Sequence, residues 1–413
     1  MDVANTLMKS DVILVVTIAL GLFIQKKKFK QIIESVIRAS TGYIIIVLGS
    51  DIALKTLSIL SLIIRRSLHV FDIIPSNETM TSIIGNYNGR NTLIIMFIGM
   101  LTNAVIARFT KLKYIFINGY YILYMAGMLA LFINDKPSNE LIVIGGVYLG
   151  FIMSLLPYIT SPFIEKITNK KDIGLAHFGS LACLIGGICA KIFKNSEDEK
   201  RPKKSFTFMR DSNFLIALSM FIIYLILILN VDKDFLYDFT GETSKIYIAF
   251  KYSITFTSAF YLIILGVRMM TDEIVYSFKG IAEKVIVDAK PAVDIAVFFT
   301  YNPQIVIMGF IISLIGGIIT AIFQIKFRCP VVVPSIITHL FSGGMAALFG
   351  FSSGKKRGAI LSAFIHGIII TIIPIFLMSL LKPHIGLMRT CYADSDFGIF
   401  AIIFYYIRRI INI

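Results

Sequence analysis

The sequence YMAGMLALF at Tyr124–Phe132 recurs, slightly altered, as FSGGMAALF at Phe341–Phe349. Both copies are apolar, contain glycine and have a spacing typical of a helix. The central glycines, Gly127 and Gly344, are 217 residues apart, and the phenylalanines that end the two copies differ by the same number. Duplication of a larger unit is therefore the first hypothesis about the fold.

The same offset of 217 aligns other parts of the chain, because YIIIVLG at Tyr43–Gly49 lies over FYLIILG at Phe260–Gly266. Chance similarity between apolar helices is the alternative explanation. Chance explains a single match, but it does not readily keep one register over more than a hundred residues. We therefore predict two internal repeats, at approximately 41–195 and 258–412.

Composition and hydropathy indicate that lipid is the main solvent of this chain. Apolar residues make up 56% of the 413 residues, and the mean hydropathy is +0.81. The apolar residues gather in blocks, many of them near the length of about 20 residues with which a helix crosses a bilayer. We predict an all-α polytopic membrane protein, one embedded domain over 1–413, with about 11 transmembrane helices. The blocks are roughly 11–24, 41–64, 92–109, 112–133, 141–157, 213–231, 247–270, 304–325, 329–350, 358–381 and 397–412.

The number of blocks between the two repeats decides their relative orientation. The aligned copies are the second and the seventh block, so an odd number of steps separates them. The second copy then enters the bilayer from the opposite side, which makes an inverted-topology repeat. Many membrane transporters are built in this way, with a substrate site near the bilayer midplane between the repeats.

Basic loops explain the net charge of +15 without a nucleic-acid partner, which we do not expect. Lys and Arg gather in cytoplasmic loops of membrane proteins. An outside N-terminus and an inside C-terminus place the segment 165–211 and the pair Arg408–Arg409 in the cytoplasm. The more acidic loops 134–140 and 231–245 then lie outside, and the basic sequence near Lys326 is the exception.

Three stretches, 71–87, 173–193 and 281–303, are too polar for a simple span and too apolar for an ordinary loop. Irregular backbone at membrane depth occurs only where protein buries it or where it lines a water-filled cavity. We predict that these stretches form re-entrant hairpins or broken helices along the substrate path. The offset places Asn77 over Asp294, so both would lie near hairpin tips and bind the hydroxyls of a small polar solute.

Asp294 and His177 have two interpretations each. A carboxylate within the membrane is a functional candidate by default, but Asp294 could also cap a short helix in a cytoplasmic hairpin. His177 stands between glycines, as in a broken helix, but it could also be a satisfied core residue. His339 and His366 lie inside predicted spans, and we interpret both as structural.

No motif of soluble-enzyme chemistry is present. The sequence contains no P-loop, no Gly-x-Ser-x-Gly and no His-Glu-x-x-His, and its four cysteines lack zinc spacing. We therefore expect no catalytic residue, no metal and no cofactor in this chain.

The sequence GVRMMTDEIVYSFKGI at Gly266–Ile281, followed by Asp294 and Pro303, resembles the membrane-embedded IIC component of the bacterial phosphotransferase system (PTS), ascorbate type. The resemblance implies eleven spans with re-entrant hairpins and an inverted repeat. It also implies a homodimer in the bacterial cytoplasmic membrane that moves sugar or sugar acid by an elevator mechanism. A separate IIB protein, charged by IIA, would phosphorylate the sugar, so the IIC chain is a permease subunit and not itself an enzyme.

The resemblance also names substrate-binding positions, and this sequence departs from the family at several of them. Tyr120 stands where the family has histidine, and Tyr124, Met125 and Phe178 stand where it has glutamine. The identity of the sugar therefore stays open. With Asn77 from the offset, the predicted substrate-binding residues are Asn77, Tyr120, Tyr124, His177, Phe178 and Asp294.

Two other functions remain as alternatives. The first is an ion-coupled secondary transporter of a small polar solute with the same architecture, using Asp294 or Glu273 for proton or sodium coupling. The second is a membrane-embedded glycosyl- or lipid-transferring enzyme. The second alternative lacks a strong charged cluster near a bilayer face.

Overall fold

The computed structural model describes most of the chain, and most of the described residues are helical. The described residues are 10–68, 72–133, 138–194, 212–286, 288–385 and 390–411. Some predictions fall partly outside them: the cytoplasmic segment at 195–211, the outside loop at 134–137, and residues 71 and 287 of two predicted re-entrant stretches.

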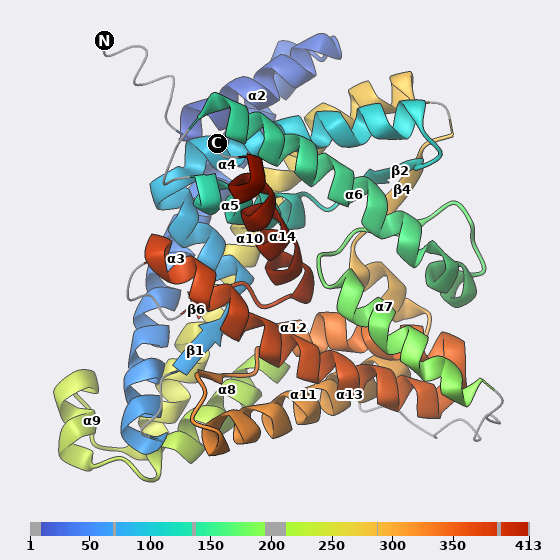
Figure 1. Cartoon of the computed structure of the whole chain (residues 1–413). Helices are drawn as coiled ribbons and strands as arrows, with labels where there is room; N and C mark the ends of the chain where they lie inside the picture. Colours follow the sequence, from blue (N-terminus) through green and yellow to red (C-terminus); the bar gives the residue numbers. More distant parts are fainter. Residues whose placement is uncertain are drawn as a thin grey trace.

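The helices and strands follow each other along the chain as Figure 1 labels them. The helices are α2 (Ser10–Ile24), α3 (Phe29–Leu68), α4 (Asn77–Phe109), α5 (Gly119–Ile133), α6 (Asn139–Thr168), α7 (Ser180–Cys189), η1 (Ala190–Phe193), α8 (Ser212–Ile228), α9 (Lys233–Thr240), α10 (Lys245–Val285), η3 (Ile295–Thr300), α11 (Pro303–Lys326), α12 (Ile336–Thr338), η4 (His339–Gly343), α13 (Gly344–Ile385) and α14 (Ser395–Ile411). The strands are β1 (Asp72–Pro75), β2 (Tyr114–Phe116), β3 (Gly174–Leu175), β4 (Lys290–Val293), β5 (Val331–Val332) and β6 (Thr390–Cys391).

Among the described residues, six helical stretches are long and apolar enough to cross a membrane. Two of them have 42 and 46 residues, so each is longer than one predicted apolar block. Helices α5 and α7–η1 are apolar but shorter. The structure therefore agrees with a multi-pass helical membrane protein. The six stretches are Phe29–Ala53, Asn88–Phe109, Asn139–Thr168, Lys233–Ile274, Gln304–Lys326 and Ile336–Leu381.

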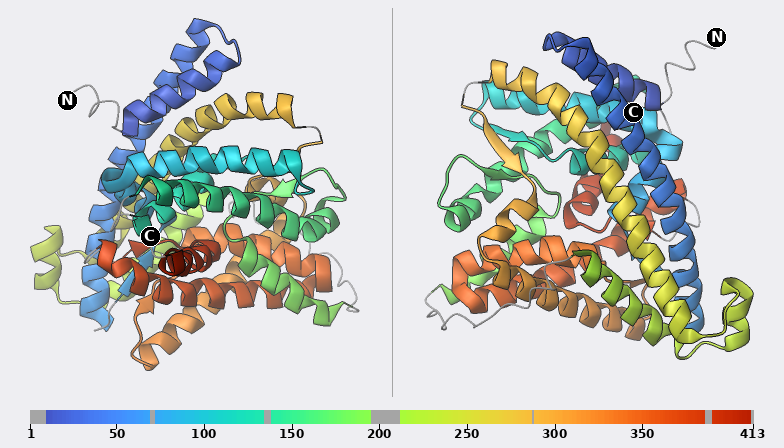
Figure 2. Two further views of the ribbon diagram at one scale, coloured as in Figure 1. Left: turned by 45° about the horizontal axis from the view of Figure 1, so that its top comes forward. Right: turned by 180° about the vertical axis from the view of Figure 1, so that it is seen from behind.

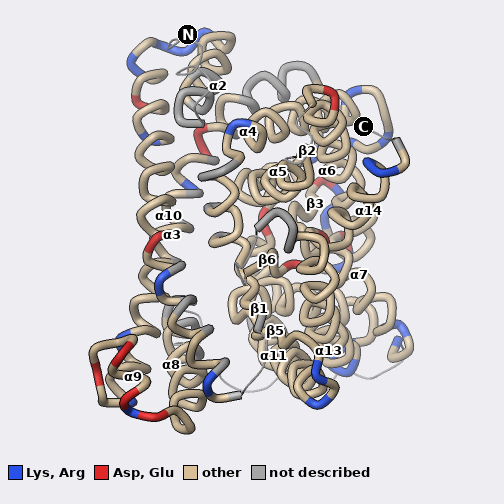
Figure 3. Tube along the Cα trace, turned by 60° about the vertical axis from the view of Figure 1, so that its left-hand side comes forward, with Lys and Arg blue, Asp and Glu red and all other residues tan. Residues whose placement is uncertain are grey.

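Large apolar side chains are exposed in stripes along the outer faces of these helices. Two such stripes, each with a spacing of four residues, are Phe97, Leu101 and Val105 on α4 and Val143, Val147 and Phe151 on α6. Soluble monomers rarely expose wide apolar surfaces, whereas lipid tails are the natural contact for such stripes. Figure 3 shows the same pattern in the charges, because long lengths of the helices carry no Lys, Arg, Asp or Glu.

Two layers of helices enclose the centre of the molecule. Helices α4 and α6 pack side by side in one layer, and α11 and α13 pack side by side in the other, with α14 between the layers (Figures 1 and 2). Small residues make this packing close. A Cβ atom on Gly150 of α6 would lie 2.4 Å from the Cβ of Thr102 of α4. Close approach at small residues is typical of helices that pair in membranes.

The long helices α3 and α10 cross at two glycines in an antiparallel arrangement. A Cβ atom on Gly42 would lie 2.6 Å from the carbonyl oxygen of Gly266, and one on Gly49 would lie 3.0 Å from that of Ala259. The residue number of the contact on α10 falls as the residue number on α3 rises, so the two helices run in opposite directions. Gly42 and Ala259 differ by 217, as do Gly49 and Gly266, and the two contacts are therefore equivalent under the sequence offset.

Within the described residues, six short strands form two parallel sheets, which the sequence did not predict. The strand orders are β5-β1-β6 and β2-β4-β3. We call residues 41–195 the first half and residues 258–412 the second half. Each sheet has its central strand from one half and both outer strands from the other. The two halves are therefore tied together by exchanged strands. Three of them, β1, β3 and β4, lie in the stretches where re-entrant hairpins or broken helices were predicted, and the other three lie outside those stretches.

One contact disagrees with the charge-based topology. The Arg408 side chain donates a hydrogen bond to the carbonyl oxygen of Phe132, so the end of α14 lies beside the end of α5. Loop charge predicts Arg408 in the cytoplasm and the loop after Ile133 outside. The contact brings together two segments that the charge-based prediction assigns to opposite sides, and the orientation of the termini stays a prediction.

Candidate functional site

Four polar residues meet at the centre because each follows a strand of the two small sheets by one to three residues. Asn77 follows β1, His177 follows β3, Asp294 follows β4 and Asp394 follows β6. Asn77 and Asp294 differ by 217, and so do His177 and Asp394. The site therefore takes one pair of equivalent positions from the starts of α4 and η3 and a second pair from the turns before α7 and α14.

Asn77 and Asp394 form a buried hydrogen-bonded pair. The Asn77 side-chain nitrogen donates to Oδ2 of Asp394 over 2.6 Å, and the Ala393 backbone N–H donates to Oδ1 of Asn77 over 2.8 Å. The Tyr121 hydroxyl donates to the same Oδ2 over 3.2 Å. The second carboxylate oxygen of Asp394, Oδ1, is buried and has no hydrogen-bond partner among the described residues. Buried acceptors are normally satisfied, so this oxygen is suited to a ligand.

His177 is fully buried beside this carboxylate. Its Nδ1 accepts a hydrogen bond from the Gly179 backbone over 2.9 Å, so we assign the proton to Nε2. Nε2 is buried and has no partner within the described chain. Gly179 has no side chain for a spatial reason, because a Cβ atom there would lie 2.8 Å from Oδ1 of Asp394 and 3.0 Å from Nδ1 of His177. The buried centre thus holds one donor, Nε2 of His177, and one acceptor, Oδ1 of Asp394, without partners among the described residues.

Asp294 caps a short helix and also contacts another predicted site residue. Its Oδ1 accepts from the Ala296 backbone over 3.5 Å and caps η3, which is the structural interpretation. Its Oδ2 accepts a hydrogen bond from the hydroxyl of Tyr120, another predicted site residue. Both residues are only partly buried. Asp294 is therefore the accessible carboxylate of the site, and Asp394 is the enclosed one.

A cluster of aromatic rings connects the predicted residues to each other. The Tyr121 ring lies 4.9 Å from that of Tyr120, 5.7 Å from that of Tyr124 and 4.1 Å from that of His177, measured between centroids. Phe178 is fully buried and packs on Phe116, Tyr121 and Phe397.

The structure thus brings all six predicted residues into one connected group. Phe178 and Tyr124 lie within its core, while Tyr120 and Asp294 lie at its edge.

Asp396 holds the second pair of positions in place. Its carboxylate accepts from the backbone N–H groups of Ser180 and Leu181 over 2.9 and 3.1 Å, at the N-terminus of α7. A carboxylate is favourable there because the free N–H groups carry partial positive charge. The Asp396 backbone N–H also donates to the Phe178 carbonyl over 3.0 Å. The start of α14 is therefore fixed to the start of α7, and Asp394 stays next to His177.

Sequence reasoning missed Tyr121, Asp394 and Asp396. The run Asp394-Ser395-Asp396 lies outside the predicted apolar blocks and looks like a polar loop. The offset of 217 was the available signal, because it carries His177 onto Asp394. Tyr121 gave no such signal, since nothing in its sequence distinguishes it from its neighbours.

Other candidate groups have at least one partner each, although Nε2 of His339 and of His366 is buried without one among the described residues. Glu273 forms an ion pair with Arg38 over 2.8 Å, away from the central group. His339 and His366 share the hydroxyl of Ser313 through their Nδ1 atoms, at 2.8 and 3.0 Å. Within the described residues, no group of three or more His, Cys, Asp or Glu is placed to hold a metal ion.

The fold and the site together define a multi-pass helical membrane protein with a buried polar centre built from two halves of the chain. The chain belongs to the family described as "PTS system sugar-specific permease component" (EIIC-GAT), which matches residues 5–400. It is also similar to the ascorbate-specific PTS system EIIC component of Mycoplasma pneumoniae, with 27% identity over 264 residues. That match covers 55% of this chain and 39% of the relative, well under two thirds of its length. The family that the sequence at Gly266–Ile281 resembles is thereby confirmed.

Proposed function

We propose that this chain is the permease (IIC) subunit of a phosphotransferase system and that it translocates a sugar or sugar acid as a IIB partner phosphorylates it. The observation that carries the proposal is the buried centre, where Nε2 of His177 and Oδ1 of Asp394 lack partners among the described residues. A sugar hydroxyl donates and accepts, so it can satisfy both groups. Family membership supplies the phosphotransfer context. IIA would in turn charge IIB, and the subunit would lie in the bacterial cytoplasmic membrane with its N-terminus outside.

The proposed binding residues are the six predicted ones and Asp394. Asn77 orients Asp394 through their hydrogen bond, and His177 and Asp294 bind hydroxyl groups directly. Either could assist in removing the proton of the hydroxyl that attacks phosphorus. Tyr120 and Tyr124 provide ring faces and hydroxyls of the kind that suit a sugar ring.

We further propose that the two halves are inverted repeats that give alternating access in a homodimer, by an elevator movement. The equivalent contacts between α3 and α10 support a two-fold axis between the halves, because antiparallel helices of equivalent sequence require one. The exchanged strands support the same axis, since each half provides one central and two outer strands. A substrate at this axis is placed where transporters with inverted repeats bind their cargo.

Transport by reconstituted vesicles tests the proposal against its alternatives. Vesicles that contain the full chain receive a panel of labelled sugars, with phosphorylated IIB on the cytoplasmic side and no ion gradient. We expect one sugar to accumulate as its phosphate ester. Accumulation of unmodified sugar that an ionophore abolishes would instead indicate an ion-coupled transporter. A lipid-linked product would indicate a transferase.

A further inference from the structure

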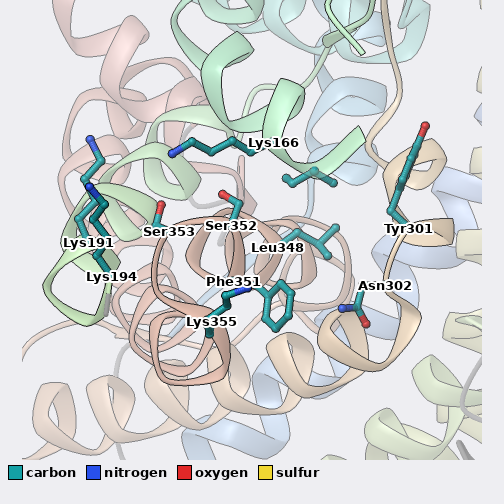
Figure 4. Close-up of a pocket in the computed structure, with 11 residues that line it drawn as sticks. Lys166, Lys191, Lys194, Tyr301, Asn302, Leu348, Phe351, Ser352, Ser353 and Lys355 are labelled. Carbon is teal, nitrogen blue, oxygen red and sulfur yellow. The ribbon is translucent and has the colours of Figure 1, made fainter. Parts of the chain in front are cut away.

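A cavity lies apart from the central site, at the ends of several helices. Its volume is about 560 Å³, within the usual range for small-molecule pockets. It is bounded by the C-terminal turn of α6, by η1, by a break in α13 and by the junction of η3 with α11. Figure 4 shows the lining residues. They are Lys166, Ile167, Lys191, Lys194, Tyr301, Asn302, Leu348, Phe351, Ser352, Ser353 and Lys355.

The charge of this cavity has one sign. Four lysines line it, at positions 166, 191, 194 and 355, and none of its described lining residues is acidic. Lysine amino groups bind phosphate as compact point charges. Lys191 and Lys194 come from η1 and its end, and Lys166 comes from α6, so separate elements converge on the same space. This arrangement selects an anion.

A buried hydroxyl gives independent evidence for a ligand. Ser353 lines the cavity and is only 9% exposed, yet its hydroxyl oxygen is buried without a hydrogen-bond partner among the described residues. Folded proteins seldom leave such a group unsatisfied. The neighbouring Ser352 hydroxyl, by contrast, donates to the Phe349 carbonyl over 2.8 Å. Ser353 is therefore the group that a phosphate oxygen would satisfy.

The backbone next to Ser353 is held in an uncommon conformation. Helix α13 breaks at Gly354 and Lys355, and Lys355 has φ 54° and ψ −147°, which side-chain-bearing residues rarely adopt. Gly354 packs against η1, because a Cβ atom there would lie 2.3 Å from the Ala190 carbonyl oxygen. The break therefore keeps Ser353 and Lys355 beside the lysines of η1.

A short helix connects this cavity to the central site. Helix η3 begins directly after Asp294 and leads to Tyr301 and Asn302 in the cavity wall. At a rise of about 2 Å per residue, its six residues span about 12 Å. A product that leaves the central site toward this side would thus meet the lysines after a short distance.

We propose that this cavity binds a phosphate monoester, namely the phosphorylated sugar on its way out. The proposal rests on the proposed function for the source of the ester, but phosphate binding itself can be measured without transport. The lysines supply the charge, and the Ser353 hydroxyl donates to a phosphate oxygen. The phosphate headgroup of a lipid has related chemistry and is the competing source.

The test uses the purified full chain in nanodiscs of phosphatidylcholine, with inorganic phosphate as the probe at constant ionic strength. Calorimetry should show saturable binding that Lys191→Gln/Lys194→Gln weakens at least tenfold and Ser353→Ala weakens several-fold. The matched control is Lys28→Gln/Lys30→Gln, which removes the same charge from exposed positions outside the cavity and should bind as wild type.

Two outcomes would overturn the proposal. One is equal phosphate binding by the wild type, the cavity variant and the control, provided that circular dichroism shows all three folded. The other is the absence of saturable phosphate binding together with co-purification of phosphatidylglycerol that the cavity variant loses and the control keeps, which would assign the cavity to a lipid headgroup. Either result leaves the vesicle assay of the proposed function unaffected, so the two proposals fail separately.

Discussion

At the scale of single residues, the site depends on a buried carboxylate of which one oxygen is hydrogen-bonded and the other is not. Asp394 uses Oδ2 for Asn77 and Tyr121, while Oδ1 faces the Gly179–His177 turn without a partner among the described residues. Burial makes an unpaired acceptor costly, so a ligand that supplies a donor gains more there than at the surface. Specificity for a polar ligand follows from the same asymmetry, because an analogue that lacks the hydroxyl leaves both groups unpaired.

We predict that Asp394→Asn weakens sugar binding by about tenfold or more. A hydrogen bond to a charged group contributes about 1.5–3 kcal/mol, and 1.4 kcal/mol corresponds to a factor of ten in the dissociation constant. The measurement is equilibrium binding of the labelled sugar identified in the vesicle assay. Tyr121→Phe is the matched control, because it removes one donor to Oδ2 and leaves Oδ1 unchanged; its effect should be smaller. Wild-type affinity in Asp394→Asn would remove this residue from the site.

We also predict that Asp294→Asn and His177→Ala abolish uptake while the protein remains folded in the membrane. Asp294 is the accessible carboxylate and His177 is the buried donor, so each variant removes a different contact with the sugar. Uptake is measured in the vesicle assay, and folding by a monodisperse profile after detergent extraction. Near-normal uptake by both variants would contradict the proposed roles.

At the scale of elements, the crossing of α3 and α10 is fixed by atoms in backbone contact. Gly42 and Gly266 leave no room for a side chain, since a Cβ atom on either would lie within 2.6 Å of the carbonyl oxygen of the other. Backbone atoms cannot rotate away as a side chain can, so any larger residue must push the helices apart. Helix α3 belongs mostly to the first half and α10 mostly to the second. Separating the two helices would therefore change the relative position of the two layers.

We predict that Gly42→Ala destabilises the protein by about 1–3 kcal/mol, the usual cost of overpacking. Unfolding of the detergent-solubilised protein by heat or denaturant gives the comparison with wild type. Gly85→Ala is the control, because a Cβ atom there would meet nothing within 4 Å and alanine is the better helix former. Gly85→Ala should be neutral or stabilising. Equal stabilities of the two variants would argue against the close crossing.

At the scale of the whole molecule, the sequence predicts the long helices better than the short strands and the contacts between helices. The offset of 217 is readable because a helix pattern survives substitution at any one position. The starts of β2 and β5, at Tyr114 and Val331, differ by the same number. The strands themselves escape prediction because they are two to four residues long and too short to show a period. The contact of Arg408 with Phe132 escapes it as well, since loop charge does not report where a terminal helix stops.

The candidate site is likewise predicted only in part from the sequence. Asn77, His177 and Asp294 are recognisable because polar residues stand out in apolar surroundings. Asp394 lies among other polar residues and is hidden from composition, although the repeat points to it. The cavity of lysines is also invisible in sequence, because its members come from four separate segments that only folding brings together.

The exchanged strands predict how the halves depend on each other. A chain cut between residues 195 and 211 and expressed as two fragments should co-purify and bind the sugar, because each sheet needs strands from both fragments. Either fragment expressed alone should be degraded or aggregate, since its strands lose their partners. Co-purification through a tag on one fragment measures this. A single fragment that is soluble in mild detergent and monodisperse would contradict the exchange.

The pairing of β1 with β6 has a consequence for biosynthesis. Ala393 donates to Asn77 across 316 positions of sequence, so the nascent chain must insert its first half with that amide unsatisfied. Residues 390–396 are translated long after the first half, and only then can they close the centre. A chain that stops before residue 390 would therefore lack β6 and Asp394, and membrane proteases would meet an open edge of β1 in place of a closed sheet.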